Sequence, residues 1–555
     1  MNRRWLWIIA AVLVAALAAP FVLNLAGDAQ VHLAIAENFV HGRPFQYNPN
    51  GEIVVASTSP FWTMQLILFF RLAGEYAPVF LSAITVVIWL SAAYVLYRAA
   101  RDLWHFEGVA LWAVVLLWLL HTTIVANALG GLENVLSALQ LLLIYVLSAR
   151  YRSSLTVPRA AVLGGLLGWA LLTRPDGGAF ALALVVLFLL AAWPVSFSQL
   201  ATLFGTALLV LAPWYAYQAA ETGRLLTDSS VARLYNGRQG SLAIIPGRLY
   251  LHPKALVSLG SAFLPLSAGY VVQLVALLAA IIRAAGARFR WYREHYPQAA
   301  AVILVAVGLG FYTFVVGAEA FGRYFLPLFP FLFLAGVGGW KELYGWLAAR
   351  GRERWAVGLV GLALLFMVAT SGLDAYRRLV PGNFASDRVL NVIYGPANRQ
   401  YFSVNLPALV AAPRNRPAAT DELLGDLGAT PADAPISIAV TEVQLRYFVD
   451  ERVEVISLDG RTSADIFAYI DPDTGVPDFE RYFLDVQPDY VHAAQWCEVG
   501  GWLAGVFSST IEENLVCHWE KLAGEMQPGD TFLWQDHPVT LVAPQIFHID
   551  WSSGP

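Results

Sequence analysis

Repeated apolar stretches constrain this chain more than any other feature. Up to about residue 375 the sequence carries successive runs of about 18 residues with few charges, and a helix of that length spans the hydrocarbon core of a bilayer. The whole chain is 58% hydrophobic and 14% charged, whereas the part after Asp374 has the composition of an ordinary soluble domain. We therefore predict a polytopic α-helical membrane protein with two domains, a transmembrane part at 1–376 and a soluble α/β part at 377–555.

The hydropathy pattern predicts about eleven transmembrane helices. They lie at 5–25, 76–97, 107–126, 132–149, 160–173, 178–194, 200–217, 258–282, 297–316, 324–340 and 355–373. Charge decides the status of a twelfth apolar segment, 58–73, because Lys and Arg accumulate in cytoplasmic loops. If 58–73 lies along the membrane surface, the basic clusters share the inner side: Arg3/Arg4, Arg98/Arg101, Arg150/Arg152/Arg159, Arg283/Arg288/Arg290/Arg293 and Lys341/Arg350/Arg352/Arg354. We therefore predict that 58–73 is an interfacial helix of the first outer loop.

The same count predicts which segments face outward. Met1-Asn2-Arg3-Arg4 followed by an apolar run indicates a retained anchor with a cytoplasmic N-terminus in the plasma membrane. An odd number of crossings then makes the C-terminal domain extracytoplasmic. The predicted outer segments are 27–75, 127–132, 174–177, 218–257, 317–323 and 374–555. Most of the unusual polar residues of the membrane half fall in these segments, so we expect the functional site at the outer face.

Net charge and cysteine content limit the function only a little. A formal net charge of -5 gives no reason to expect nucleic-acid binding. The two cysteines, Cys497 and Cys517, both lie in the tail, where two free thiols and a disulfide are equally compatible with an exported domain. Neither cysteine resembles a metal ligand.

The tail alternates short strand-like and helix-like pieces after a linker rich in Pro, Ala and Arg. That linker is predicted at 407–419, with a helical piece at Glu442–Phe448. The predicted strands are Ile436–Val440, Val453–Leu458, Tyr490–His492, Leu515–Trp519 and Val539–Phe547. The tail has no Gly-rich phosphate loop, nucleophile elbow or metal-ligand motif.

The first outer loop holds the leading catalytic candidate. Asp28 follows the first predicted helix, where a carboxylate is either an N-cap of the next helix or a partly desolvated general base with a pKa near working pH. If 28–40 is helical, His32 lies one turn from Asp28 on the same face. His32 would then orient an acceptor or tune the acid, unless it is simply an interfacial polar residue.

Two later outer turns carry further charged candidates. Glu133 stands where the fourth span begins, and an acid there is costly unless it is paired, functional or a snorkelling boundary residue. Arg174 and Asp176 share a tight turn, in which they either pair locally or bind substrate. His121 and Asn127 lie nearby in sequence and are weaker candidates.

Cations near the tenth span suit a phosphate ligand. Arg323 enters the membrane close to Glu319, and a phosphate would compensate its charge because a guanidinium binds phosphate oxygens bidentately. The outer loop 218–257 is long for a structureless connection, which favours a function for it. Its cations either supplement Arg323 or form a solvated basic loop: Arg224, Arg233, Arg238 and Lys254.

Carboxylates and cations around a membrane-level site suit a substrate with an anionic head and a lipid tail. A sugar linked to a polyprenyl phosphate fits, because the phosphate is a good leaving group that needs no separate acid. Asp28 would deprotonate the attacking hydroxyl, and Arg323 would stabilise the charge that grows on the phosphate. Such a transfer requires no cofactor; the outer carboxylates are compatible with a divalent metal, although nothing indicates one.

At this point the residues resemble a known family. Asp28, Glu37-Asn38, Gly42, Asn48-Pro49-x-Gly51-Glu52 and Thr58-Ser59-Pro60-x-Trp62 look like the first outer loop of C-type membrane glycosyltransferases. The likeness is closest to the branch that contains the mycobacterial terminal arabinofuranosyltransferase. Three later motifs are also similar to that branch: Gly131-Leu132-Glu133, Arg174-Pro175-Asp176-Gly177 and Arg323-Tyr324-x-x-Pro327-x-x-Pro330.

The resemblance implies an inverting transfer from a polyprenyl-phosphate sugar on the exoplasmic side, with Asp28 as the base. It covers most of 1–340 and, more loosely, the tail. This chain has Gly27-Asp28 where the family commonly has two adjacent acids, which leaves one carboxylate for the role. It also has Ala34 where the family commonly has an Arg.

We therefore expect a glycosyltransferase that acts on an extracytoplasmic glycan or lipid acceptor. The predicted catalytic residues are Asp28 and Glu133, and the predicted substrate-binding residues are Arg323, His32, Arg174, Asp176, Glu319, Arg233 and Lys254. A transporter or flippase for a lipid-linked sugar would favour acids and broken helices at the bilayer midplane, and the polar landmarks here lie at span ends. A third alternative is a non-catalytic surface protein whose tail binds glycan.

Overall fold

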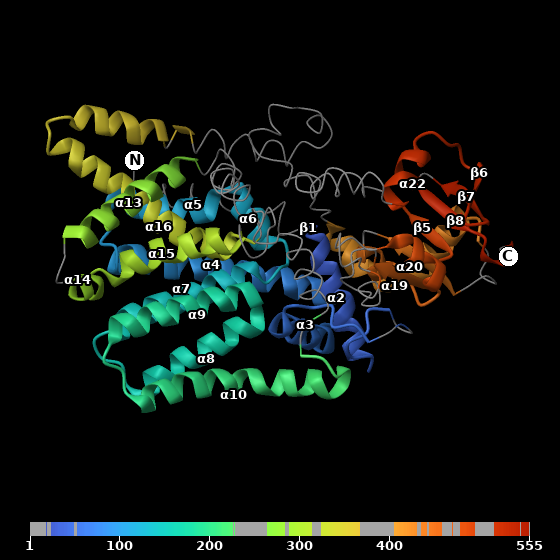
Figure 1. Cartoon of the computed structure of the whole chain (residues 1–555), viewed down its shortest axis with the longest axis horizontal. Coiled ribbons are helices and arrows are strands. Elements are labelled where there is room, and N and C mark those ends of the chain that lie inside the picture. The colour runs from blue at the N-terminus through green and yellow to red at the C-terminus, as the bar shows by residue number, and fades with distance from the viewer. Residues whose placement is uncertain are drawn as a thin grey trace.

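The computed structural model shows a bundle of helices joined to a smaller domain built around a β-sheet (Figure 1). It describes residues 18, 24–48, 51, 53–225, 227, 264–283, 288–312, 324–363, 365–366, 404–429, 435–440, 443–457, 469, 478–493, 515–543 and 545–553, and the statements below concern these residues.

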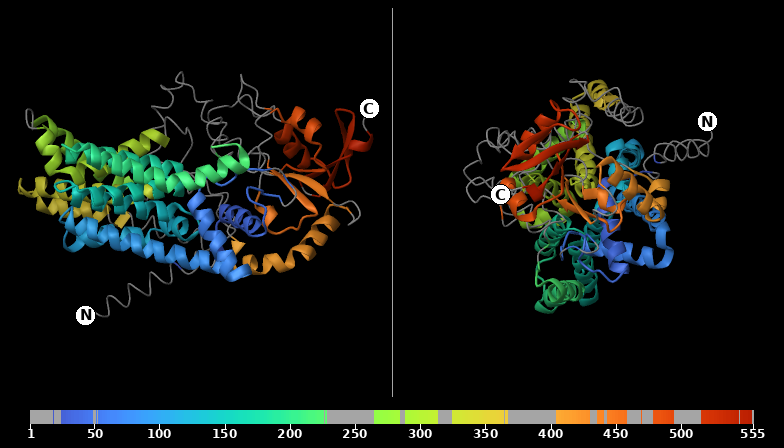
Figure 2. Two further views of the ribbon diagram at one scale, coloured as in Figure 1. Left: turned by 90° about the horizontal axis from the view of Figure 1, so that it is seen from below. Right: turned by 90° about the vertical axis from the view of Figure 1, so that its right-hand side faces the viewer.

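Most helices of the bundle run along the long axis of the molecule, whereas α2 lies across one end, between the bundle and the sheet (Figures 1 and 2). The helical elements of this half are α2 (Gly27–Val40), α3 (Pro60–Ala73), η1 (Gly74–Tyr76), α4 (Ala77–Asp102), α5 (Gly108–Leu120), α6 (Thr122–Leu129), α7 (Asn134–Tyr151), α8 (Val157–Thr173), α9 (Pro175–Ala192), α10 (Phe197–Thr222), α13 (Leu264–Arg283), α14 (Arg288–Glu294), α15 (Tyr296–Gly310), η6 (Leu326–Leu328) and α16 (Phe329–Ala348). One continuous apolar core joins this half to part of the sheet domain.

Several of these helices have the length and composition of membrane spans. Five stretches of the described chain qualify: Pro60–Asp102, Asn134–Tyr151, Pro175–Ala192, Phe197–Thr222 and Pro265–Arg283. Three shorter apolar helices accompany them: Gly108–Leu120, Val157–Thr173 and Tyr296–Gly310. Most of the first predicted span, 5–25, lies outside the described residues, so the total of eleven stays a prediction.

The structure describes two of the predicted apolar segments, 107–126 and 58–73, in more detail than the sequence does. The span expected at 107–126 is interrupted, because His121 takes an extended backbone (ψ 116°) between the end of α5 and the start of α6. The apolar segment 58–73 is helical, as α3, and η1 joins it to α4. α3 packs against α2 at the end of the bundle (Figure 1), and its position along a membrane surface stays a prediction.

The domain at the other end contains a six-stranded mixed sheet of order β4-β3-β5-β8-β7-β6. Its strands are β3 (Ile436–Val440), β4 (Val453–Ser457), β5 (Tyr490–His492), β6 (Thr531–Trp534), β7 (His537–Ala543) and β8 (Ile546–Ile549). The other elements of this domain are α19 (Leu406–Asp426), η8 (Val443–Tyr447), α20 (Phe479–Val486), α22 (Leu515–Ala523) and η10 (Trp551–Ser553). β4 and β5 pair with β3 in parallel, and the remaining pairs are antiparallel.

Two predicted strands of the tail are wrong. Leu515–Trp519 begins the helix α22, in which Leu515, Trp519 and Leu522 recur at helical spacing and pack against the sheet. Val539–Phe547 is two strands rather than one. The chain turns back at Gln545, whose φ of 63° lies in the left-handed region, so that β7 and β8 pair antiparallel.

The linker predicted at 407–419 is also wrong, because this segment lies inside the helix α19. Pro413 and Pro417 lie within the helix, and prolines there suggested a linker because they disfavour helix continuation. The α19 helix packs against α4 and η1 of the bundle. Just before it, β2 (Val404–Asn405) pairs antiparallel with β1 (Asn24–Leu25). The segment thus docks the tail onto the first loop.

Candidate active site

Asp28 lies in the first turn of α2, half-buried, at the end of the bundle that faces the sheet domain. Ala26, not Asp28, is the N-cap residue of this helix. A carboxylate in the first helical turn is stabilised by the positive end of the helix dipole. The amide of Ala26 donates a hydrogen bond of 2.8 Å to the carbonyl of Gly130. The start of α2 is therefore fixed to the turn that precedes α7.

Gly131 provides close packing at this junction. Its φ of 80° lies in the left-handed region, and a Cβ there would approach Leu25 Cδ2 to 2.9 Å and Ala29 Cβ to 3.2 Å. Its carbonyl accepts a hydrogen bond of 3.2 Å from the indole of the buried Trp62 in α3. Two sequence motifs that are far apart, the first loop and the Gly131-Leu132-Glu133 turn, therefore meet here.

His32 joins α2 to that turn. It lies one helical turn after Asp28, as expected once 27–40 is helical. Its Nδ1 is 3.3 Å from Ser57 Oγ in the first loop, and its Nε2 is 3.7 Å from Glu133 Oε2. The side chains of His32 and Glu133 are 12% and 6% exposed. Glu133 Oε2 accepts no hydrogen bond from the described residues, and the His32 imidazole is the cation-forming group that lies beside it.

Arg174 is the centre of the buried charges. Its Nη1 donates to Glu133 Oε1 at 2.6 Å and to Asn134 Oδ1, while its Nε and Nη2 each bind one oxygen of Asp176 at 2.8 Å. All three guanidinium nitrogens are therefore engaged by protein groups. The side chains of Arg174, Glu133 and Asp176 are only 7%, 6% and 11% exposed. The local Arg174–Asp176 pair considered from the sequence is present, and Glu133 extends it.

Asp176 connects these charges to the segment before α16. Besides Arg174, it accepts a hydrogen bond of 2.9 Å from the amide of Gly177. The hydroxyl of Tyr312 lies 2.9 Å from Asp176 Oδ2 and 2.7 Å from the carbonyl oxygen of Tyr324. The Tyr324 ring in turn faces the Arg174 guanidinium, with 5.4 Å from Cζ to the ring centroid. We call His32, Glu133, Arg174 and Asp176 the charged cluster.

The electrostatics of the charged cluster follow from its composition. Two carboxylates surround one guanidinium in a water-poor environment, where ionic interactions are stronger than in water. The imidazole of His32 faces the second oxygen of Glu133. Such an arrangement can fix the position of a neighbouring helix and attract a positive or proton-donating group. Within the described parts of the chain, no three His, Cys, Asp or Glu side chains are placed to hold a metal ion.

Other predicted residues are either buried elsewhere or not described. His121 is buried directly before α6, and Asn127 is buried within this helix. Four predicted substrate-binding residues lie outside the described residues: Glu319, Arg323, Arg233 and Lys254. Cys497 also lies outside them, so the choice between thiols and a disulfide stays open.

Four contacts of the charged cluster were not predicted as site residues. They are Ser57, Asn134, Tyr312 and Tyr324. Ser57 and Asn134 are direct sequence neighbours of motifs named above, and Tyr324 is part of one. Their position next to these motifs is the signal that could have identified them. Tyr312 stands in an apolar run, and nothing local distinguishes it from a core tyrosine.

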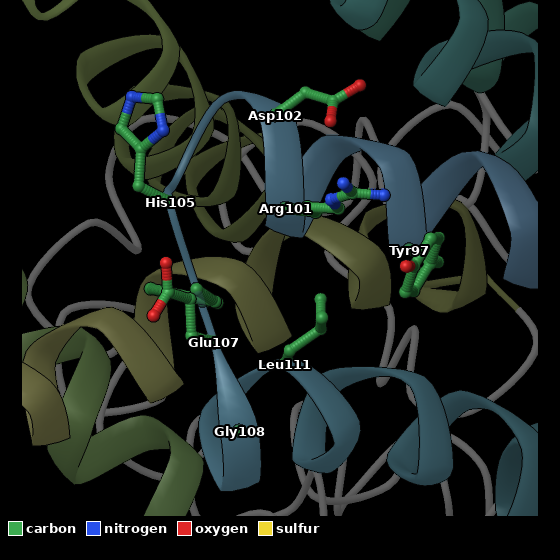
Figure 3. A pocket seen from close by; sticks show the side chains of 8 residues that line it. Tyr97, Arg101, Asp102, His105, Glu107, Gly108 and Leu111 are labelled. Atoms are coloured by element: carbon green, nitrogen blue, oxygen red, sulfur yellow. The ribbon is translucent and has the colours of Figure 1, made fainter.

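A cavity of about 520 Å³ lies at the opposite end of the bundle, where α4 ends and α5 begins (Figure 3). Its lining residues are Tyr97, Arg101, Asp102, His105, Phe106, Glu107, Gly108 and Leu111. Asp102 binds Arg98 and lies 3.7 Å from Arg150, near the C-terminal end of α7, whereas Glu133 precedes the N-terminal end. The length of α7, about 27 Å at 1.5 Å per residue, separates the cavity from the charged cluster.

Comparisons with known proteins add a likeness of overall fold. No family model matches the chain, and no curated protein matches it. Two solved structures of ArnT from Cupriavidus metallidurans are similar to it, each with a TM-score of 0.47. ArnT bound to undecaprenyl phosphate is 15% identical and is matched over 90% of this chain and 95% of its own. ArnT in the apo state is 18% identical and is matched over 88% and 92%. We therefore infer a function only from the residues of this chain.

Proposed function

We propose that this chain is an integral-membrane glycosyltransferase that moves a sugar, with inversion, from a polyprenyl-phosphate donor to an extracytoplasmic glycan or lipid acceptor. Asp28 acts as the general base. The transmembrane domain is 1–376 in the plasma membrane, with a cytoplasmic N-terminus, and the extracytoplasmic domain is 377–555. No cofactor is required for a donor whose leaving group is a phosphate.

One observation supports this proposal most strongly. A half-buried carboxylate, Asp28, stands at a helix N-terminus one turn from His32, which belongs to the charged cluster at the end of the apolar bundle. A general base needs partial desolvation and a fixed orientation, and both are available there. A lipid-linked donor can reach such a position from the bilayer, while an acceptor approaches from the aqueous side.

The charged cluster has a supporting role in this mechanism. Because Arg174 is engaged at all three nitrogens by Glu133, Asn134 and Asp176, we assign it to orienting the two carboxylates. The proposed phosphate ligand is Arg323, which directly precedes Tyr324 in the sequence, and Tyr324 faces Arg174. Glu319, Arg233 and Lys254 remain proposed contributors to donor binding.

The reaction follows from these roles. Asp28 accepts the proton of the attacking acceptor hydroxyl as the new glycosidic bond forms at the anomeric carbon. The bond from that carbon to the phosphate oxygen breaks on the opposite face, and polyprenyl phosphate leaves with the electron pair. A neighbouring guanidinium stabilises the growing negative charge, so no acid has to protonate the leaving group.

A transporter or flippase for lipid-linked sugars is the alternative. Transport sites typically use broken helices and ionisable residues near the bilayer midplane. Glu133, Arg174 and Asp176 all lie at the ends of α7, α8 and α9. The enzyme accounts for this position better.

The test is a transfer assay with the purified full-length chain in liposomes. Synthetic polyprenyl-phosphate pentoses and hexoses are offered with short glycan acceptors, and new glycosidic product is measured. Asp28→Asn should lower the turnover by about 10²–10⁴-fold, which is the usual contribution of a general base. Asp102→Asn is the matched control. It makes the same type of substitution at the opposite end of the bundle and should leave turnover unchanged.

Two results would contradict the proposal. A folded Asp28→Asn protein with near wild-type turnover would remove Asp28 as the base. Movement of the intact lipid-linked sugar across the liposome membrane, without any new glycosidic product, would favour the transporter.

A further inference from the structure

We propose that the C-terminal domain is a working part of the active site, because it fixes the orientation of α2 through Arg416 and Glu37. These two are positioning residues for Asp28 and His32. This inference rests on the proposed function, since it assigns the domain a role in that same site.

The faces of α2 provide the first argument. Residues on an α-helix are about 100° apart around its axis, so His32 lies about 40° from Asp28, whereas Glu37 lies about 180° from it. The face that carries Asp28 and His32 meets the rest of the charged cluster through the His32–Glu133 contact. The opposite face meets the C-terminal domain. The helix that carries the proposed base is therefore held from two sides by different parts of the chain.

The Arg416–Glu37 pair is the main contact on the second side. The two guanidinium terminal nitrogens of Arg416 bind the two carboxylate oxygens of Glu37 at 2.9 and 2.6 Å. The side chains are 16% and 13% exposed. Arg416 also donates to the carbonyl of Tyr447 at 2.9 Å, and its guanidinium faces the Tyr447 ring at 5.2 Å. A bidentate pair with a third hydrogen bond fixes an angle as well as a distance.

A second contact fixes the loop that follows α2. The side-chain amide of Asn48 donates to the carbonyl of Val455 at 2.9 Å, and its oxygen accepts from the Val455 amide at 3.1 Å. Val455 is in β4, an edge strand, so Asn48 supplies the hydrogen bonds that a further strand would make. Asn38 of α2 donates to the carbonyls of Gln46 and Tyr47 and holds this loop against the helix.

These contacts favour positioning over simple stabilisation. Replacing a buried ion pair with apolar residues is often neutral or stabilising, so the presence of such a pair is weak evidence for a stabilising role. The bidentate geometry of the Arg416–Glu37 pair, in contrast, defines an orientation. A catalytic base must be held within a fraction of an ångström of its productive position. Rotation of α2 about its axis would move Asp28 away from that position, and the Arg416–Glu37 pair resists this rotation from the opposite face.

The experiment compares Arg416→Met with wild type in the full-length chain. Backbone hydrogen exchange over residues 28–40 should accelerate by about tenfold or more, because the helix loses its hold on one side. In the liposome transfer assay, kcat should fall about 10- to 100-fold while the KM for the donor changes less than about threefold, since misplacement of the base weakens the transition state and not donor binding.

Arg414→Met is the matched control. Arg414 is two residues away on the same helix and pairs with Glu75 of η1, but it is 69% exposed and does not touch α2 in that pair. In the Arg414→Met variant, the hydrogen-exchange rates over 28–40 and the kcat should stay within about twofold of the wild-type values. The double variant Glu37→Arg with Arg416→Glu should recover part of the kcat that each single variant loses.

Three outcomes would overturn the inference. The first is unchanged hydrogen exchange over 28–40 in a folded Arg416→Met protein. The second is a loss of kcat in Arg414→Met equal to that in Arg416→Met. The third is a change of the donor KM in Arg416→Met without a change of kcat. If Arg416→Met does not fold, Asn48→Ala provides the same two measurements, and unchanged values there contradict the inference. The exchange result is independent of catalysis, so failure of the proposed function, seen as no transfer by wild type, is distinguishable from failure of the positioning role.

Discussion

The two ends of the helix bundle use similar charged residues in opposite ways. At the end near α2, Arg174 is 7% exposed and is bound by Glu133 and Asp176. At the other end, Arg98 pairs with Asp102, but these side chains are 38% and 30% exposed. Both ends thus pair an arginine with one or two carboxylates. The pair is buried at the end near α2 and partly exposed at the other end.

This difference in burial is one reason why we propose the functional site at the end near α2. Charges that water surrounds cost little to keep and contribute little when paired, whereas buried charges are costly unless every partner is present. The second end also collects the basic residues expected on the cytoplasmic side, including Arg101, Arg150 and Lys341, around an open cavity. We therefore expect mutations at the first end to have the larger effects, and the following predictions test that contrast.

The largest effect is expected for Arg174→Gln. Without the guanidinium, Glu133 and Asp176 are left as buried carboxylates with no cation between them. Breaking such a pair costs about 3–5 kcal/mol of unfolding free energy. Denaturation of the detergent-solubilised chain measures this. Arg150→Gln, whose side chain is 49% exposed, is the control and should cost less than about 1 kcal/mol. Equal costs for the two variants would remove the contrast between the ends.

A smaller effect is expected for Gly177→Ala. A Cβ at Gly177 would overlap Ser137 Oγ in α7, and overpacking of this kind costs about 1–3 kcal/mol. The control is Gly205→Ala in α10, where a Cβ meets nothing within 4 Å. Gly205→Ala should leave stability unchanged or raise it slightly, because Ala favours helix. If Gly177→Ala has the same unfolding free energy as wild type, α7 and α9 pack less closely at Ser137 than they do in this structure.

Tyr312→Phe tests the hydrogen bonds at the edge of the charged cluster. It removes the hydroxyl that lies between Asp176 and the Tyr324 carbonyl, and a lost hydrogen bond costs about 0.5–1.5 kcal/mol, or more where it serves a charged group. Tyr97→Phe at the cavity of the opposite end is the matched control and should cost almost nothing. A similar loss in both variants would contradict the hydrogen bond between Tyr312 and the charged cluster.

The smallest effect is expected for Arg98→Gln, and it should depend on salt. The pair with Asp102 is partly exposed, so we expect a loss of less than about 1 kcal/mol in dilute buffer. In about 1 M salt the Debye length falls to about 3 Å and the difference should vanish. Melting of Arg98→Gln and Arg174→Gln at both salt concentrations tests this, since the cost at the buried cluster should persist in salt.

Local sequence patterns predicted much of the fold and part of the site. The strands Ile436–Val440 and Tyr490–His492 have the predicted bounds, because alternation and β-branched residues determine them locally. His32 lies one turn from Asp28, as the helical spacing requires. The proximity of Glu133 to Arg174 came from three-dimensional packing, although both residues had been singled out separately by their position at span ends.

Long-range contacts could not be predicted from the sequence. The Arg416–Glu37 pair joins residues 379 positions apart, and Arg416 lay in a segment interpreted as a linker. The alanines of this segment are compatible with a helix. The packing of α19 against α4 and η1 stabilises that helix, and composition does not reveal this packing. For the same reason Leu515–Trp519 was predicted as a strand, since a short apolar run fits either a strand or a buried helix.

An experimental structure of the full-length chain in a lipid nanodisc, with a polyprenyl-phosphate sugar bound, tests the placement of the active site most directly. We expect the anomeric carbon of the sugar to lie beside the N-terminus of α2, on the side of Asp28 and His32, with the prenyl chain running along the bundle. A donor bound at the opposite end, in the cavity beside Asp102 and His105, would contradict this placement.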